Sequence, residues 1–247
     1  MNIYGLIGKN LGHSFSANYF NEKFQIERIN SHYELFPLSS ISEFPSLITN
    51  NPDLKGLNIT IPYKQAIIPY LDKLSDEAKE VGAVNVIKFY YDNNGSQILE
   101  GYNSDVFGFK NSILPLLNSK IKNALILGNG GASKAVIYVL NNLDINVTVV
   151  SRTKEKGDIT YDDLNEDIVH KNLLIVNTTP LGMFPDIDSF PRIPYQYLTS
   201  KHVCFDLVYN PLETVFLKKG KEMGATVKNG LEMLKLQADA AWEIWNR

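Results

Sequence analysis

The sequence predicts an α/β protein with two domains. Short apolar runs, which are typical of buried strands, alternate with amphipathic segments along most of the chain. The chain has 247 residues, and at about 100–200 residues per domain this length suits one large domain or two modest ones. Strands that alternate with helices favour a parallel sheet covered on both faces. We place the domain boundary near residues 103–105, just after a predicted hairpin.

The first hundred residues are expected to form an α/β unit whose sheet ends in this hairpin. Aromatic side chains at helical spacing predict one helix, and Ser40 with Glu43 gives the capping-box spacing at the start of another. Asn94 and Gly95 tolerate the positive φ angles of a hairpin turn. These patterns predict helices over 14–24 and 40–48, strands over 3–7, 32–35 and 54–59, and hairpin strands over 83–90 and 97–102.

The remainder of the chain shows a more regular alternation of strands and helices. One amphipathic helix is predicted over 133–140 and another over 231–245, where apolar side chains share one face. Compact apolar runs predict strands over 123–127, 147–150, 173–176 and 203–207.

Composition and charge exclude several classes of protein. The 24 basic and 27 acidic residues give a net charge of −3, which argues against a nucleic-acid-binding protein. No apolar run approaches the roughly 20 residues of a membrane helix, and the start does not resemble a signal peptide. A soluble cytoplasmic protein is therefore expected, and the single cysteine suits a reducing compartment. No metal-ligand spacing occurs among the histidines, which are His13, His32, His170 and His202.

A glycine-rich turn gives the strongest local signal for a cofactor. The apolar run 123–127 leads into Gly128, Gly130 and Gly131, and a predicted helix follows. In a dinucleotide site the first glycine makes the tight turn and the second lets the backbone approach the pyrophosphate. The helix N-terminus then supplies free N–H groups and a positive dipole end. A plain turn is the alternative, but the flanking strand and helix favour a dinucleotide.

The next predicted strand indicates which dinucleotide binds. NAD sites usually end this strand in Asp or Glu, which binds the ribose 2′-hydroxyl. Here Arg152 stands 24 residues after Gly128, close to the expected spacing of about 20 residues. An arginine attracts a 2′-phosphate through charge-assisted hydrogen bonds. NADP is therefore favoured, and a solvated basic turn over 151–156 is the alternative.

Polar residues at the end of the strand over 54–59 are candidates for the chemistry. Asn58, Thr60 and Lys64 follow an apolar segment, where open α/β sheets bind ligands. Pro62 ends the strand and predicts a helix that holds Lys64. Taken singly, Lys64 could be a solvated surface charge. By the same reasoning Asp105 could be a helix N-cap, and Asn85 a hydrogen-bonded residue at a strand edge.

Nine ordered motifs cover nearly the whole chain. They are Gly12-His13-Ser14-Phe15-Ser16, Asn58-Ile59-Thr60-Ile61-Pro62-Tyr63-Lys64, Gly82-Ala83-Val84-Asn85, Asn103-Ser104-Asp105, the glycine loop 128–135, Ser151-Arg152-Thr153, and the segments 177–183, 206–214 and 229–234, the last leading to Gln237. In this order they resemble the motifs of the shikimate dehydrogenases. The chain departs from the family pattern by small changes: Asn129 replaces Ala, Ser104 replaces Thr, Ser151 replaces Asn and Val86 replaces Thr.

The resemblance implies an oxidoreductase that reversibly reduces 3-dehydroshikimate to shikimate with NADPH, in aromatic amino acid biosynthesis. It implies an N-terminal α/β substrate domain over 1–103 and a Rossmann-type NADP-binding domain over 104–230. The C-terminal helix over 231–247 is expected to return to the first domain, and the protein to be a monomer or homodimer. Lys64 is expected to donate and accept the proton, with Asp105 paired to it and to a substrate hydroxyl.

The resemblance also assigns binding residues one by one. The substrate, a cyclohexene carboxylate with several hydroxyls, calls for hydroxyl-rich recognition. The implied substrate residues are Ser14, Ser16, Thr60, Lys64, Asn85, Asp105, Tyr209 and Gln237. The implied NADP residues are Gly128, Asn129, Gly130, Gly131, Ala132, Ser151, Arg152, Thr153, Asn177, Thr178, Thr179, Leu207, Gly230 and Met233.

Three other functions remain open at this point. The first is a relative that acts on quinate, or on both compounds, with NAD as an alternative cofactor; the serine pair and Arg152 argue against it. The second is a catalytically silent NADP-binding module, which Lys64 and Asp105 disfavour. The third is a folate-linked dehydrogenase of similar plan, which the order of the motifs disfavours.

Overall fold

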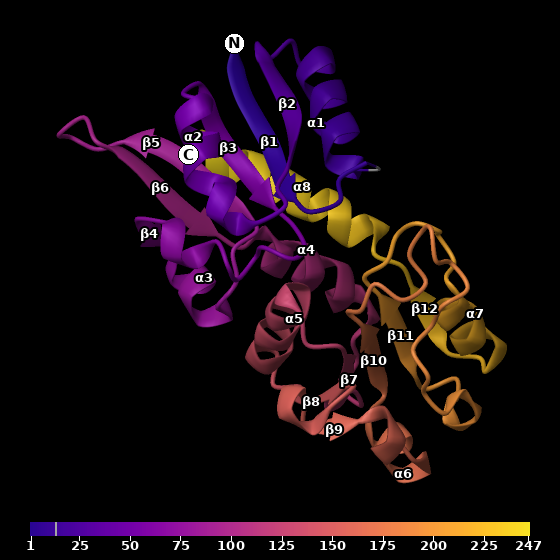
Figure 1. The fold of residues 1–247 in the computed structure, drawn as a ribbon. Coiled ribbons are helices and arrows are strands. Elements are labelled where there is room, and N and C mark those ends of the chain that lie inside the picture. The colour runs from indigo at the N-terminus through magenta and orange to yellow at the C-terminus, as the bar shows by residue number, and fades with distance from the viewer. Residues whose placement is uncertain (13) are drawn as a thin grey trace. The chain divides into compact units, whose positions relative to one another are not determined.

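The computed structural model describes residues 1–12 and 14–247, which form two compact units (Figure 1). Unit 1 contains Met1–Ser104 and Ala238–Arg247, and unit 2 contains Asp105–Gln237. Each unit is built around its own six-stranded sheet, so the predicted α/β class is confirmed. Among the described residues, none of the helices combines the length and the hydrophobicity that a membrane span requires.

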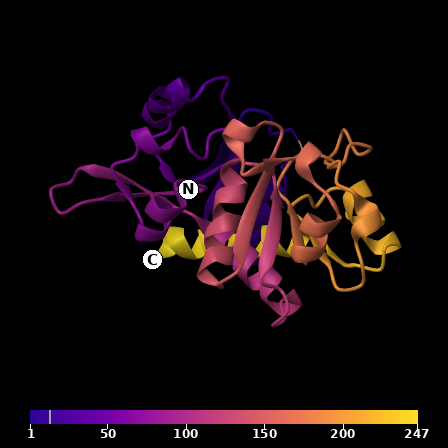
Figure 2. The ribbon, with the colours of Figure 1, turned by 90° about the horizontal axis from the view of Figure 1, so that it is seen from below.

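The sheet of unit 1 is mixed and has the order β2-β1-β3-β5-β6-β4. The first three strands are parallel to one another, while β5 pairs antiparallel with β3 and with β6. The hairpin of β5 and β6 extends beyond the rest of its sheet (Figures 1 and 2). The strands are β1 (Asn2–Gly8), β2 (Ser31–Pro37), β3 (Leu54–Ile59), β4 (Lys73–Leu74), β5 (Val86–Tyr91) and β6 (Gln97–Tyr102).

Three helices of unit 1 connect these strands: α1 (Phe15–Ile26), α2 (Phe44–Asn50) and α3 (Asp76–Val81). The predicted capping box is present, with the backbone N–H of Ser40 donating to the Glu43 carboxylate at 2.8 Å. It caps a 3-10 turn over Ile41–Glu43, and α2 starts only after it. The helix predicted after Pro62 is absent. The carbonyl of Lys64 accepts from the backbone N–H of Val84 at 2.7 Å, so it is not part of a helical ladder.

Two apolar clusters cover the two faces of this sheet. One of them includes the end of the last helix, α8 (Leu231–Asn246), where Trp245 packs with Tyr4 and Phe20. The Trp245 indole N–H donates to the carbonyl of Ile87 at 3.0 Å. A Cβ at Gly56 would lie 2.2 Å from Trp245, so β3 needs glycine there to let the indole approach.

The sheet of unit 2 is entirely parallel and has the order β12-β11-β10-β7-β8-β9. From β7 the chain adds β8 and β9 on one side of the sheet, and it then returns to add β10, β11 and β12 on the other side. This is the doubly wound order of dinucleotide-binding folds, and its ligand crevice lies outside the carboxyl ends of the strands where the order reverses. The strands are β7 (Asn123–Leu127), β8 (Asn146–Ser151), β9 (Ile159–Thr160), β10 (Leu174–Asn177), β11 (Val203–Asp206) and β12 (Thr226–Lys228).

The helices of this part of the chain are α4 (Ser104–Ile113), α5 (Gly131–Asn142), α6 (Glu166–Lys171) and α7 (Val215–Glu222). The apolar residues of β7, β10 and β11 are fully or almost fully buried, as expected for strands covered on both faces. The unit boundary falls within α8, whose residues through Gln237 belong to unit 2.

Candidate functional site

The glycine-rich turn lies between β7 and α5, at the carboxyl end of the central strand of unit 2. Gly128 has a φ of +106°, and a Cβ there would lie 2.8 Å from the side chain of Thr179. Gly130 is the N-cap of α5 and gives no side-chain cap, and nothing lies within 4 Å of the place where its Cβ would stand. No protein atom therefore fills the space beside Gly130 at the start of α5, and a helix N-terminus left uncovered in this way suits the pyrophosphate of a dinucleotide.

The predicted residues of the neighbouring strand meet this turn. The backbone N–H and the hydroxyl of Thr178 both donate to the carbonyl of Leu127, at 3.0 and 2.8 Å. Thr178 follows β10 and Leu127 ends β7, so the contact lies where the strand order reverses. The structure thus brings Gly128, Thr178 and Thr179 together at the expected crevice of the fold.

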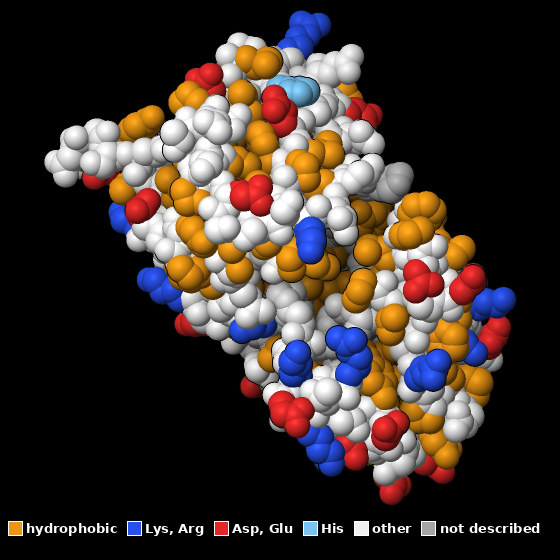
Figure 3. Space-filling model, in the orientation of Figure 1, with side chains coloured by type: hydrophobic (Ala, Val, Ile, Leu, Met, Phe, Trp, Pro, Cys, Tyr) orange, Lys and Arg blue, Asp and Glu red, His pale blue; other side chains and the backbone are white. Residues whose placement is uncertain are grey.

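The basic turn after β8 lies beside the glycine turn. Ser151 is buried, and its hydroxyl bonds to the backbone of Thr153, while Arg152 is exposed. The side-chain amide of Asn129 donates to the carbonyl of Lys156, which ties the two turns together. Lys and Arg side chains gather over the region of α5 and β7 (Figure 3). An exposed cation at the end of β8, with no acid in its place, suits a 2′-phosphate rather than a bare ribose.

Two further predicted cofactor residues of unit 2, Leu207 and Gly230, lie against each other. Gly230 precedes α8, and its N–H donates to the carbonyl of Val208 at 3.0 Å. A Cβ at Gly230 would lie 2.2 Å from the carbonyl oxygen of Leu207, so only glycine permits this approach. One helical turn further on, Met233 is buried.

Three predicted substrate residues belong to unit 2. Asp105 lies in the first turn of α4 and is 5% exposed, so it is not the N-cap that its sequence position also allowed. The side-chain amide of Gln237 donates to the carbonyl of Leu234 at 2.9 Å. Gln237 also packs closely against α4, because a Cβ added at Gly108 would lie only 3.0 Å from the Cβ of Gln237. Tyr209 is half-buried in the segment after β11.

A buried polar network connects two of the predicted substrate residues of unit 1, Ser16 and Asn85. The hydroxyl of Tyr33 donates to Asn58 at 2.7 Å, and it also bonds to Ser16. The amide of Asn58 donates to the carbonyl of Asn85 at 3.3 Å. Asn85 in turn exchanges two hydrogen bonds with Ser104, at 3.0 and 2.7 Å. Tyr33 belongs to none of the motifs in the sequence, so sequence reasoning did not single it out.

Removal of the Tyr33 hydroxyl is expected to destabilise the protein. In Tyr33→Phe the buried side-chain oxygen of Asn58 loses its phenol donor, and an unsatisfied buried group costs about 1–3 kcal/mol. Urea unfolding measures this loss directly. Tyr91→Phe is the control, because Tyr91 is 62% exposed and should change stability by less than about 0.5 kcal/mol. Equal stability of the two variants would contradict the network.

Two further predicted residues of unit 1, Thr60 and Lys64, follow the end of β3. The N–H of Thr60 donates to the carbonyl of Ile7 at 2.8 Å, and Lys64 is half-buried on the turn that follows. Ser14 lies directly before α1, where its backbone N–H donates to the carbonyl of Leu11. His13, the neighbour of Ser14 in the motif, lies outside the described residues.

Asp206, which the sequence did not single out for a role, is the most strongly perturbed carboxyl of unit 2. Burial raises the pKa of Asp206 to about 6, although hydrogen bonds from Thr214, Val208 and Asn177 act in the opposite direction. Its side chain is 0% exposed. Two signals in the sequence mark Asp206: it directly follows the apolar run Val203-Cys204-Phe205, and it begins the motif over 206–214.

This raised pKa predicts a specific pH dependence of stability. Because the folded-state pKa of about 6 lies above the ordinary 3.8, the folded state holds an extra proton between these values. The contribution of Asp206 to stability is therefore fully present below about pH 4 and is lost as the pH rises through 6. We expect the stability of the protein relative to Asp206→Asn to fall by about 3 kcal/mol between pH 4 and 7, at about 1.36 kcal/mol per pKa unit.

Urea unfolding of both proteins across this pH range tests the prediction, since all other titrating groups cancel in the difference. Cys204 and Tyr195, the titratable groups that interact with Asp206, stay neutral in this range because burial raises the pKa of each. If the difference in unfolding free energy between the wild type and Asp206→Asn does not change with pH, the prediction is wrong.

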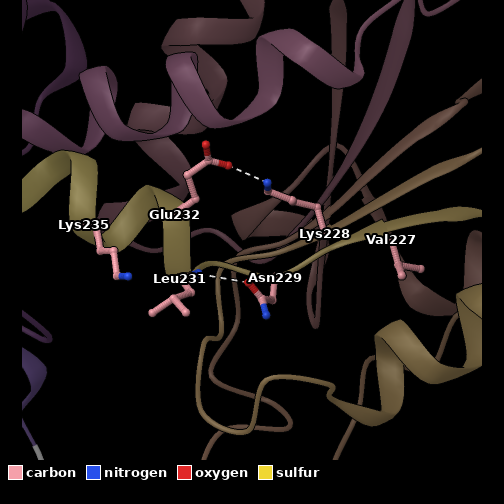
Figure 4. Close-up of a pocket in the computed structure, with 6 residues that line it drawn as sticks. All are labelled: Val227, Lys228, Asn229, Leu231, Glu232 and Lys235. Carbon is pink, nitrogen blue, oxygen red and sulfur yellow. Dashed lines mark hydrogen bonds and ion pairs between the residues drawn. The ribbon is translucent and has the colours of Figure 1, made fainter.

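Among the surface hollows of the described residues, one lies in each unit, and neither of these two is lined by a residue predicted for substrate or cofactor. The hollow of unit 2, about 420 Å³, lies beside the start of α8 (Figure 4). There Lys228 forms an ion pair with Glu232, and the N–H of Leu231 donates to Asn229 at 3.2 Å. The hollow of unit 1, about 520 Å³, lies beside β4. Among residues 1–12 and 14–247, no group of three or more His, Cys, Asp or Glu could hold a metal ion.

Comparison with known proteins gives consistent matches. Residues 6–87 match the family model of the shikimate dehydrogenase substrate binding domain. A Clostridium beijerinckii protein named shikimate dehydrogenase (NADP(+)) is 41% identical over 263 residues, covering 99% of this chain and 92% of its own. The structure of Thermus thermophilus shikimate 5-dehydrogenase in complex with NADP(H) and shikimate has a TM-score of 0.85 at 28% identity, covering 99% of this chain and 93% of its own. Quinate dehydrogenase from Corynebacterium glutamicum, in complex with NAD, has the same TM-score, identity and coverage.

Proposed function

Because the chain belongs to the shikimate dehydrogenase family, we propose that it reversibly reduces 3-dehydroshikimate to shikimate with NADPH. The observation that carries this proposal is the 41% identity to a shikimate dehydrogenase (NADP(+)) over 99% of the chain. The reaction would serve aromatic amino acid biosynthesis, and we place the protein in the cytoplasm, as a monomer or homodimer.

The cofactor is proposed to bind at the carboxyl ends of β7, β8 and β10 in unit 2. The N-terminus of α5 and the glycine turn before it would hold the pyrophosphate, since no side chain caps this helix and no protein atom fills the space beside Gly130. Arg152 would hold the 2′-phosphate, with Ser151 and Thr153 shaping its turn. The remaining proposed contacts are Asn129, Gly130, Gly131, Ala132, Asn177, Thr178, Thr179, Leu207, Gly230 and Met233.

The substrate is proposed to be held by hydroxyl, amide and charged side chains. In unit 1, Ser14 and Ser16 would donate to the carboxylate, and Thr60 and Asn85 would bind the carboxylate or ring oxygens. Tyr209 and Gln237 of unit 2 are proposed to serve the same purpose. Such a site rejects analogues that lack a hydroxyl, because its own polar groups would then be left unpaired.

Lys64 is proposed as the proton donor for reduction and the acceptor for oxidation. When bound, NADPH supplies the hydride that reduces the carbonyl carbon. Negative charge then develops on the carbonyl oxygen, and the Lys64 ammonium would donate a proton to it. Asp105 would accept a hydrogen bond from a substrate hydroxyl and so orient the ring.

A second candidate is a dehydrogenase that accepts quinate, or that uses NAD. The structural likeness to a quinate dehydrogenase in complex with NAD is the observation that supports it. Arg152 at the end of β8 favours NADP, because NAD sites usually carry an acid there. A catalytically silent NADP-binding module would instead share the cofactor site and show no turnover.

One assay separates these candidates. The purified protein is mixed with shikimate or quinate and with NADP⁺ or NAD⁺, and reduced cofactor is followed by absorbance. We expect rapid NADPH formation with shikimate and NADP⁺, and much slower rates in the other three mixtures. Faster turnover with quinate would assign the second candidate, and a protein that binds NADP⁺ without any turnover would be the silent module.

A further inference from the structure

A buried carboxylate joins three separate segments at the carboxyl edge of the unit 2 sheet. Asp206 ends β11 and is fully buried. One of its oxygens accepts from the amide of Asn177 at 2.9 Å and from the N–H of Val208 at 3.0 Å. The other accepts from the hydroxyl of Thr214 at 2.6 Å. The carboxylate therefore fixes the end of β10, the segment after β11 and the start of α7 at one point.

The hydrogen bonds of Asn177 extend this arrangement toward the cofactor residues. Its side-chain oxygen accepts from both the N–H and the hydroxyl of Thr179, at 3.1 and 2.6 Å. The hydroxyl of Thr179 in turn accepts from the N–H of Leu181 at 3.3 Å. The conformation of residues 177–181, which contain three proposed NADP contacts, thus depends on an amide that Asp206 holds.

The second segment carries a proposed substrate contact. The N–H of Val208 is held by Asp206, and its carbonyl accepts from the N–H of Gly230. Leu207 and Tyr209 lie on either side of Val208. At the far end of the segment, Thr214 caps α7 by accepting from the N–H of Leu217 at 3.3 Å. Asp206 therefore orients residues 207–209 and fixes where the segment rejoins the fold.

Resting on the function proposed above, we infer that Asp206 is a positioning residue of the dehydrogenase, which holds residues 177–181 and 207–214 in the conformation that binds NADP and substrate. It touches neither ligand itself and acts through Asn177, Val208 and Thr214. An acceptor-only group suits this place, because all three partners donate. A 1 Å misplacement of binding groups can lower turnover by about 10²-fold.

Two substitutions at Asp206 separate positioning from stability. Asp206→Ala leaves the three donors without their acceptor. Asp206→Asn preserves the shape and one acceptor oxygen, and its amide can donate to the Thr214 hydroxyl oxygen, so it is the conservative rescue. The matched control is Val203→Ala, at the opposite end of β11, where a side chain that is 4% exposed is truncated away from the two segments.

The dissociation constant of NADP⁺, measured by fluorescence titration below the unfolding transition of each variant, is the first readout. We expect Asp206→Ala to raise it by about tenfold or more, and Asp206→Asn to restore most of the affinity. We expect kcat for shikimate oxidation to fall by about 10²-fold in Asp206→Ala. Val203→Ala, although less stable than the wild type, should keep both quantities within about twofold, because distant sites act independently.

The inference is overturned if Asp206→Ala binds NADP⁺ as the wild type does, or if Val203→Ala weakens binding equally for the same loss of stability. If Asp206→Ala does not fold, the NADP⁺ dissociation constants of Asp206→Asn and Val203→Ala are compared instead. The inference predicts weaker NADP⁺ binding in Asp206→Asn even where Val203→Ala is the less stable protein. A role in stability alone predicts the weaker binding in whichever variant is less stable, and that result would overturn the inference. NADP⁺ binding does not depend on shikimate turnover. A wild-type protein that binds NADP⁺ but does not oxidise shikimate would therefore contradict the proposed function and leave this test intact.

Discussion

Lys64→Ala is expected to lower kcat for shikimate oxidation by about 10²–10⁴-fold, the usual contribution of general acid–base catalysis. The alanine has no group that can exchange a proton with the substrate oxygen. The backbone should tolerate the change, because Lys64 contributes its carbonyl to the fold through the N–H of Val84, and alanine keeps that carbonyl. NADP⁺ affinity should change little, since Lys64 lies in unit 1 and the proposed cofactor residues lie in unit 2.

The matched control is Lys55→Ala, which removes an exposed lysine from β3, the strand that precedes Lys64. It changes the net charge equally and should leave kcat within about twofold of the wild type, as expected for a distant, independent site. Steady-state kinetics with shikimate and NADP⁺, together with a cofactor titration, give both values. A Lys64→Ala variant that keeps its kcat and only raises the KM for shikimate would make Lys64 a binding residue.

Arg152→Ala is expected to erode the preference for NADP⁺ over NAD⁺. Charge-assisted hydrogen bonds are worth about 1.5–3 kcal/mol each, so kcat/KM with NADP⁺ should fall by about 10–10²-fold. With NAD⁺, kcat/KM should change by less than about threefold, because NAD⁺ has no 2′-phosphate for Arg152 to bind.

Arg192→Ala provides the control for Arg152→Ala, because it removes an exposed arginine from the same unit and changes the net charge equally. Its ratio of catalytic efficiencies should equal that of the wild type. An unchanged ratio in Arg152→Ala would show that the basic turn after β8 is simply solvated and that another group selects the cofactor.

Local patterns in the sequence predict most of the elements. The apolar run 123–127 and the glycines after it predict β7, the turn and α5, since each of these depends on residues close in sequence. The parallel arrangement of the strands in unit 2 follows from the alternation of strands and helices in the chain. The two-residue strands β4 and β9 show no apolar period, and only their neighbours in the sheet define them.

Long-range contacts explain what the sequence did not predict. The helix expected after Pro62 does not form, because Val84 takes the carbonyl of Lys64 from twenty positions away in the chain. Asp206 finds Asn177 on the adjacent strand, and only the register of β10 and β11 brings the two together. Tyr33 likewise meets Asn58 across the sheet of unit 1. In each case the partners share no local spacing that a sequence motif could show.

Transfer of deuterium from the nicotinamide C4 of NADPH to the product tests the proposed reaction most directly. The protein is incubated with 3-dehydroshikimate and stereospecifically deuterated NADPH, and the product is examined by mass spectrometry and NMR. The account predicts shikimate that carries the deuteron on the ring carbon that was the carbonyl, from one of the two C4 epimers of the labelled cofactor. Unlabelled shikimate from both epimers, or consumption of NADPH without formation of shikimate, would contradict it.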